Sequence, residues 1–400
     1  MPKQSWKIAL AVAVALPSLW VRLSGSHLPP LPSVLVFGAA VVAASFLLAW
    51  AAEVAQVDIS ASFATAILAL IAVLPEYAVD LYFAYSAGTR PEYAAYAAAN
   101  MTGSNRLLIG VGWPLVVLLF ALGLRKRKES VRPVVLHPRR RLELGFLLVA
   151  GVYAITIPLK SHLSLTDAVI LLALFAGYLW RTSHQENEEP ELHGLPAVLA
   201  ELPTGMRRGT VVGLFVTAAA LIGLAAKPFA DGLVEGGRSL GLDEFLLVQW
   251  LAPLSSEAPE LIVAGILASR GDDETALGTL LSSKVNQWTL LVGSLPLAYA
   301  VGGGGLTLHL DPRQNEEFLL TAGQALFAVA LLLNLRLRTR EAVLLFGTFI
   351  AQFFFPQESV RLWLAGSYGV LAVGLTIHYR ASLLPTLASF RARSKTSNDS

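Results

Sequence analysis

The chain has 400 residues, of which 55% are hydrophobic and only 14% are charged, and its mean hydropathy is +0.60. That apolar fraction exceeds the roughly 45–50% of an ordinary soluble domain, so the composition predicts an all-α integral membrane protein whose main partner is the lipid bilayer. The net charge of +2 comes with no basic surface interleaved with aromatic residues, so no nucleic-acid partner is expected, and the lack of cysteine excludes disulfides and thiolate metal sites.

Apolar runs predict about twelve transmembrane helices. The first lies within residues 1–32 and is compatible with a retained helix or a cleaved signal peptide; the lack of a small-residue cleavage pattern favours a retained helix. The other spans are expected at about 33–52, 60–87, 93–123, 141–160, 163–181, 209–227, 243–269, 275–301, 316–335, 340–356 and 361–379.

The distribution of Lys and Arg predicts the topology of these spans. With the N-terminus inside, the predicted cytoplasmic segments hold 21 of the 30 basic residues and the opposite side holds seven. This bias predicts a multi-pass protein of the cell membrane with both termini in the cytoplasm. The two remaining cations, Arg106 and Lys284, fall within spans.

A pair of acids lies inside the predicted eighth span. Glu257 and Glu260 are one helical turn apart and so share one face of a helix. A charge at that depth costs about 3 kcal/mol or more unless it faces a cavity, a partner or an ion. Pro253 precedes the pair and Pro259 lies between its two acids; both prolines are expected to free backbone carbonyls, while Ser256 adds a hydroxyl. Such oxygen atoms in a broken membrane helix predict a cation site near the bilayer midplane.

The third span carries a similar pair, Glu76 and Asp80, also one turn apart. Each pair precedes a helix rich in Gly, Ser and Asn, within 98–114 and 277–296, so the arrangement is an internal repeat. The second copy begins five spans after the first, and an odd offset inverts it. We therefore expect a ten-helix core of two inverted five-helix repeats, with broken helices at the midplane.

The repeats define the expected domain organisation. It comprises a peripheral N-terminal helix (1–32), a first membrane repeat (33–181), a cytoplasmic linker (182–208), a second membrane repeat (209–356), and an extra C-terminal helix with a polar tail (357–400).

At these motifs the sequence resembles the cation/calcium exchanger superfamily, whose inverted repeats carry motifs of the form G-[ST]-S-x-P-E and G-N-x-x-G-S-N-x-x-[ND]. The likeness covers about 63–118 and 245–297. The matching residues are Leu74, Pro75, Glu76, Asn100, Gly103, Ser104 and Asn105 in the first repeat, and Ser256, Pro259, Glu260 and Ser283 in the second. The resemblance implies that Glu76 and Glu260 are paired acids that ligate the transported cation.

The sequence also departs from the family pattern, as in a divergent member. The departures are Ala72 and Val73 at small-hydroxyl positions, Leu108 in place of an Asn or Asp, Arg106 after the GSN triplet, Lys284 at the second Asn position, Gln287 or alternatively Asn286 near a later acid position, and the additional acids Asp80 and Glu257. The candidate cation ligands are thus Glu76, Glu260, Asp80, Glu257, Asn100, Ser104, Asn105, Ser256, Ser283, Asn286 and Gln287, with Arg106 and Lys284 as candidate tethered cations.

Structural roles remain open for several of these residues. Glu76 and Glu260 are also compatible with ion pairs to Arg106 and Lys284. Small polar residues hold membrane helices together as well, and this alternative applies to Asn100, Ser104, Ser283 and Asn286.

The sequence favours a secondary antiporter that exchanges Ca²⁺ or another cation against Na⁺ or H⁺ by alternating access, without a cofactor. The alternatives are an Na⁺/H⁺ or K⁺/H⁺ antiporter that does not carry Ca²⁺, and a passive cation channel. An enzyme is disfavoured, because all seven histidines lie in or near predicted loops, no HExxH motif occurs, and Asp80 is the only mid-span aspartate. Four motif acids facing two built-in cations favour one transported cation exchanged against protons or few Na⁺ ions.

Overall fold

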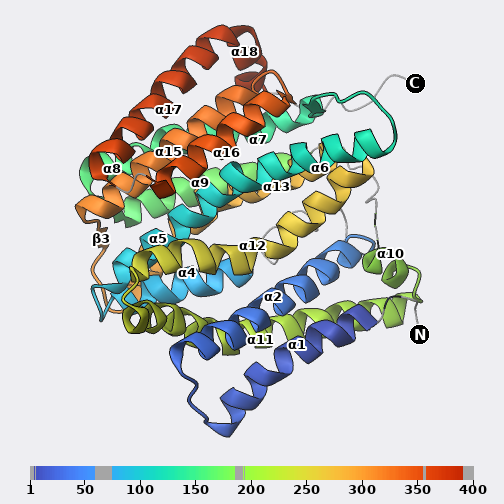
Figure 1. Ribbon diagram of the computed structural model, residues 1–400, viewed down its shortest axis with the longest axis vertical. Coiled ribbons are helices and arrows are strands. Elements are labelled where there is room, and N and C mark those ends of the chain that lie inside the picture. The colour runs from blue at the N-terminus through green and yellow to red at the C-terminus, as the bar shows by residue number, and fades with distance from the viewer. Residues whose placement is uncertain are drawn as a thin grey trace. The chain divides into compact units, whose positions relative to one another are not determined.

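The computed structural model describes residues 4, 6–58, 74–184, 192, 194–354 and 357–390. The chain forms two compact units, each built from two stretches of sequence. The first unit comprises Met1–Phe83 and Leu179–Pro259, and the second comprises Ala84–Tyr178 and Glu260–Ser400. The described residues are mainly helical, as the composition predicts (Figure 1).

Helices occur at every predicted span. Eight of the described helices are long and apolar enough to cross a membrane by length and composition: Trp6–Ser24, Pro30–Ala55, Tyr93–Lys126, Pro138–Lys160, Leu165–Thr182, Thr204–Leu240, Glu244–Arg270 and Glu358–His378. The first part of the predicted third span, residues 60–73, lies outside the described residues, and so do Ala72 and Val73.

The first unit is built around two long helices that pack against each other. Its helices, in whole or in part, are α1 (Trp6–Ser24), α2 (Pro30–Ala55), α4 (Leu74–Ala87), α10 (Leu195–Ala200), α11 (Thr204–Leu240) and α12 (Glu244–Arg270). Figure 1 shows α1, α2 and α11 side by side. Small residues bring α2 and α11 close, because a Cβ on Gly38 would lie 2.9 Å from the ring of Phe229.

An ion pair at one end of this unit joins the same two helices. Asp58 follows α2 and receives hydrogen bonds from Arg207 at 2.7 and 2.8 Å, near the start of α11, and from Arg208 at 3.2 Å. The hydrogen bond from Arg207 is the main reason that the pKa of Asp58 falls to about 2.

The second unit holds most of the remaining elements. They are α5 (Tyr93–Leu107), η1 (Leu108–Gly112), α6 (Trp113–Lys126), η2 (Pro138–Arg140), α7 (Arg141–Ala154), α8 (Thr156–Lys160), α9 (Leu165–Thr182), α13 (Asp273–Asn286), η3 (Gln287–Leu291), α14 (Val292–Val301), α15 (Pro312–Leu332), α16 (Thr339–Phe354), α17 (Glu358–His378) and α18 (Arg380–Ala388). η1 and η3 are π-helical turns, each inserted between two α-helices of a longer rod. Local caps define several helix starts, as where Asp311 and Gln314 form a capping box at α15.

Two short antiparallel ribbons connect loops of the second unit. β1 (Val134–Val135) pairs with β4 (Arg336–Leu337), and β2 (His162–Ser164) pairs with β3 (Thr307–His309). Each ribbon therefore joins a loop from the first half of the chain to a loop from the second half.

The structure corrects three details of the sequence analysis. α12 is one uninterrupted helix that contains Pro253 and Pro259, so the break predicted there is wrong. The reason is that an interruption in lipid leaves more backbone groups unpaired than two prolines do. α11 continues through Pro228 to Leu240, well beyond the predicted end at 227. The tail begins with a helix, α18, which packs against α7.

Candidate cation-binding site

The acids of the first motif lie on α4. Glu76 and Asp80 are one turn apart and only 4% and 0% exposed. Two residues further on, the Tyr82 hydroxyl donates a hydrogen bond of 2.6 Å to Asp231 Oδ1 of α11. Lys227 of α11 pairs with the same aspartate and donates to the Tyr82 oxygen at 3.3 Å. A polar contact thus fixes α4 against α11 within the first unit.

The acids of the second motif lie on α12 and differ in burial. Glu257 is 3% exposed, whereas Glu260 is partly exposed. The Ser256 hydroxyl donates to the carbonyls of Ala252 and Pro253, both at 3.3 Å. Its oxygen lone pairs remain able to accept a proton or a cation.

Two polar side chains of α5 are buried without hydrogen bonds. Asn100 and Ser104 are one turn apart and 1% and 0% exposed. The amide nitrogen and oxygen of Asn100 and the hydroxyl of Ser104 have no hydrogen-bond partner in the described part of the chain. A buried polar group left unpaired costs about 1–3 kcal/mol, and amide and hydroxyl oxygens suit hard cations. This face of α5 therefore fits a hydrated or directly bound cation.

The second repeat places an ammonium group on α5. Lys284 Nζ of α13 donates to both the backbone oxygen and Oδ1 of Asn105, each at 2.6 Å. Nζ also lies 5.4 Å from the ring centre of Trp288, where a cation–π attraction contributes. Lys284 is 1% exposed, so its charge is buried beside these oxygens and this aromatic ring.

The two contacting residues occupy equivalent places in the segments predicted to be repeats. Asn105 and Lys284 are 179 residues apart, and the π-helical turns η1 and η3 begin with the same offset, at Leu108 and Gln287. η3 packs against α5, and η1 packs against α13. Matching segments of the two repeats therefore exchange contacts.

The remaining candidates lie beside this contact on α13 and η3. Ser283 is half-buried, Asn286 is 6% exposed and Gln287 is fully buried. Among the described residues, no group of three or more His, Cys, Asp or Glu side chains is arranged to hold a metal ion.

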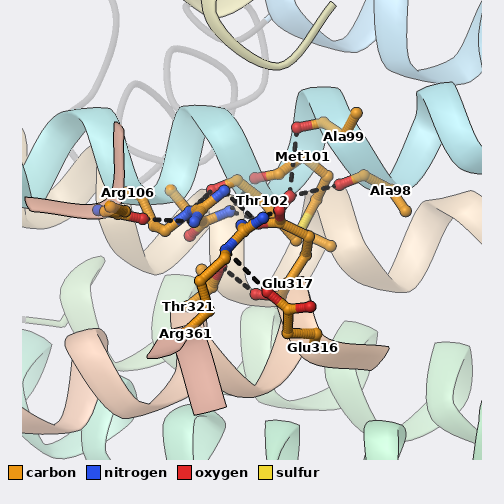
Figure 2. Close-up of polar contacts among 11 residues, drawn as sticks. Ala98, Ala99, Met101, Thr102, Arg106, Glu316, Glu317, Thr321 and Arg361 are labelled. Carbon is orange, nitrogen blue, oxygen red and sulfur yellow. Dashed lines mark hydrogen bonds and ion pairs between the residues drawn. The ribbon is translucent and has the colours of Figure 1, made fainter. Parts of the chain in front are cut away.

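A set of buried charges surrounds Arg106, and the sequence patterns did not predict it. This side chain pairs with Glu317 of α15 and donates to Gln352 Oε1 of α16 at 2.5 Å (Figure 2). Glu317 and its neighbour Glu316 also pair with Arg361 of α17. One sequence feature pointed to these charges: two adjacent acids, Glu316 and Glu317, stand at the start of the apolar run 316–335. They were interpreted only as the boundary of a span.

A third charged cluster lies where α13 begins. Asp273 accepts hydrogen bonds from Arg132 at 3.3 Å, and Glu274 accepts one from Arg140 at 2.9 Å. Burial alone raises the pKa of Glu274, but the hydrogen bond and charge of Arg140 outweigh burial and lower it. The basic loop before α7 thus holds the start of the helix that carries Lys284.

Comparison with known proteins gives a family match over most of the chain. A sequence model of the family described as sodium/calcium exchanger protein matches residues 31–183 and again residues 210–356. No curated protein sequence matches the chain.

Solved structures match along nearly the whole length. The H⁺/Ca²⁺ exchanger CAX is 45% identical, with a TM-score of 0.92 over 97% of this chain and 98% of that chain. Native YfkE is 15% identical, with a TM-score of 0.64 over 92% and 99% of the two chains. The sodium-calcium exchanger NCX_Mj is 17% identical, with a TM-score of 0.52 over 88% and 100%. At these lower identities the last two show a shared fold alone.

Proposed function

The chain belongs to the sodium/calcium exchanger family of membrane antiporters, and on that premise we propose that it exchanges Ca²⁺ against protons. The observation that carries this proposal is the likeness to an H⁺/Ca²⁺ exchanger along nearly all of both chains. Alternating access is the mechanism that fits an antiporter, because a passive channel gives no coupling between two ions.

In this proposal Glu76 and Glu260 supply the carboxylates that bind the cation. They occupy the matching Pro-Glu motifs of the two repeats. Asn100 and Ser104 support the assignment, because their buried polar atoms lack partners in the described chain and offer oxygen ligands. Asp80, Glu257, Ser256, Ser283, Asn286 and Gln287 are proposed as further polar groups of the site, which approach the ion directly or through water.

Lys284 favours protons over Na⁺ as the counter-ion. Its ammonium group already occupies both oxygens of Asn105, which a bound Na⁺ would otherwise use. Arg106 is not counted against the motif acids, because Arg106, Arg361, Glu316 and Glu317 balance one another. Only one tethered cation, Lys284, is then counted against the four motif acids, and proton binding to a carboxylate provides the exchange for Ca²⁺.

We also propose that the two family matches are inverted repeats. Inversion exchanges the loop before α7 with the loop before α15, and the loop before α9 with the loop before α16. The β1–β4 and β2–β3 ribbons follow this exchange, and so do the contacts of η1 and η3. A cell-membrane location with cytoplasmic termini is part of the proposal. Labels near Arg132 and the C-terminus should then react from the cytoplasm, and a label near Arg313 from the opposite side.

Reconstitution into sealed vesicles tests the coupling. An imposed pH gradient should drive Ca²⁺ movement without Na⁺, and an equal Na⁺ gradient at constant pH should drive little. The matched control is the Glu76→Gln variant in the same vesicles, which reports leak. Ca²⁺ movement that requires Na⁺ and ignores pH between about 6 and 8 would replace proton coupling with sodium coupling. Cation flux without any coupling would identify a channel.

A further inference from the structure

A continuous chain of buried charges links α17 to α5. Arg106 of α5 pairs with Glu317, which pairs through its other oxygen with Arg361 of α17. Arg361 Nε also lies 2.7 Å from Glu316 Oε1. Figure 2 shows these side chains together; Arg106 comes from α5, Glu316 and Glu317 from α15, and Arg361 from α17. We call the set Arg106, Glu316, Glu317 and Arg361 the arginine–glutamate cluster.

The cluster is closed to solvent and balanced in charge. The side chains of Arg106 and Glu317 are fully buried, and those of Arg361 and Glu316 are 8% and 6% exposed. Removing one partner from a buried ion pair leaves an uncompensated charge, and this strongly destabilises the fold. Glu317 therefore keeps its place between the arginines only while both remain.

Arg106 lies on the face of α5 opposite to the candidate ion ligands. Arg106 Nε donates to Thr102 O at 3.4 Å, which places Arg106 and Thr102 on one face. Asn100 and Ser104 are each two residues from Thr102, or about 200° around a helix. The cluster thus contacts one face of α5, and Asn100 and Ser104 lie on the opposite face.

The sequence of α5 explains why such a hold is needed. The segment YAAYAAAN is mostly alanine, and small residues permit close packing but interlock little with neighbouring helices. The rotation and height of α5 then depend on directional polar contacts. One such contact is the ion pair between Arg106 and Glu317 of α15, and another is the hydrogen bond from Lys284 to Asn105.

We propose that Arg361 is a positioning residue for the cation site. It holds Glu317 in the orientation that fixes Arg106, and through Arg106 it sets the position of the Asn100 and Ser104 ligands. α17 is then a working part of the exchanger, whereas the sequence alone suggests a peripheral addition. The inference rests on the proposed function for the role of α5 as a ligand-bearing helix.

The test is a graded series at position 361 in the full-length protein. Arg361→Gln removes the charge and the two-sided hydrogen bonding, and Arg361→Lys keeps the charge but cannot bridge two carboxylates in the same way. Glu316→Gln leaves the Arg106–Glu317–Arg361 chain and removes only the outer anchor. Phe327→Leu is the matched control, because its ring stacks on Tyr368 at 5.6 Å between the same two helices, α15 and α17.

The readout is the half-saturating cation concentration, measured by protection of the purified protein against heat and by flux. Loss of an outer partner of a cation site typically weakens affinity about 10–100-fold, so Arg361→Gln should raise this concentration about tenfold. Arg361→Lys and Glu316→Gln should give smaller rises. Phe327→Leu should lower the melting temperature and change the half-saturating concentration less than about twofold.

The inference is overturned if Arg361→Gln lowers the melting temperature as Phe327→Leu does but leaves the half-saturating concentration unchanged. It is also overturned if Arg361→Gln changes neither quantity. Failure of wild-type protein to bind or move Ca²⁺ rejects calcium exchange instead. In that case the same series is measured with whichever of Sr²⁺, Mn²⁺, Na⁺ or K⁺ protects the wild-type protein, so the two failures are distinguishable.

Discussion

Lys284 and Arg106, two of the buried cations in the described part of the second unit, have different kinds of partner. Lys284 is bound by two neutral oxygens of Asn105 and lies over an aromatic ring. Arg106 is bound by the carboxylate of Glu317, which a second arginine also pairs with. Neutral oxygens bind an ammonium group about as they bind a small metal cation, whereas a guanidinium–carboxylate pair is hard to exchange once buried. This difference motivates the proposed roles, in which Lys284 acts in ion coupling and Arg106 supports α5.

The largest effect is expected when the carboxylates proposed to bind the ion are neutralised. Glu76→Gln and Glu260→Gln each remove a proposed ion ligand but keep the side-chain shape. We expect exchange to fall by about 100-fold or more, because loss of a direct ligand should exceed the effect of losing an outer partner. Expression and melting temperature should stay near wild-type values. Vesicle flux and thermal melts measure the two effects, and wild-type transport rates in both variants would refute the assignment.

Neutralising Glu317, which pairs with two buried arginines, should affect stability as well as ion affinity. Glu317→Gln leaves Arg106 and Arg361 buried without their shared counter-charge, at an expected cost of about 3–5 kcal/mol. The thermal midpoint of the solubilised protein should fall markedly, and the yield of folded protein with it. Phe327→Leu serves as the packing control. An unchanged midpoint for Glu317→Gln would show that the cluster contributes nothing to stability.

Lys284 should govern which ion is coupled. Lys284→Asn restores the residue type of the family motif and frees both Asn105 oxygens. We expect Na⁺ to drive Ca²⁺ movement about tenfold better than in wild type, because a competing tethered cation is gone. Lys284→Arg is the control, since it keeps the charge in the same place. Equal Na⁺ dependence in wild type and Lys284→Asn would remove Lys284 from the coupling mechanism.

The smallest effect is expected at the ion pair between Asp58 and Arg207, outside the apolar spans. The pKa of Asp58, about 2, lies below the value near 3.9 of an unfolded aspartate. The stabilisation from this ion pair is therefore complete above about pH 4–5 and is lost as the pH falls toward and below 2. Asp58→Asn should therefore lower the melting temperature slightly at pH 7 and by less near pH 2. A melting series from pH 7 downward tests the sign; a larger effect in acid would contradict it.

Hydropathy and repetition settled much about this chain without a structure. Lipid excludes unpaired backbone and charge, so each membrane helix must appear as an apolar run, and each predicted span contains a helix in its described part. The Pro-Glu repeats and the resemblance that follows from them predicted the exchanger family, which the family match confirms. The sequence predicted which residues are candidates for the cation site, and their roles as ligands remain predictions.

Helix continuity, the π-helical turns and the partners of the buried charges depend on tertiary contacts, and local sequence did not predict them. Whether Pro253 and Pro259 break a helix depends on what surrounds it, and α12 continues through both. The π-helical turns have no local signature, although they occupy equivalent positions in the two repeats. Arg106, Glu317 and Arg361 lie far apart in the chain, and their helices carry no pattern that assigns one charge to another. Spans are fixed by the solvent that each segment meets, and so can be found from sequence; ion pairs are fixed by which helices pack together, and only the folded structure determines that.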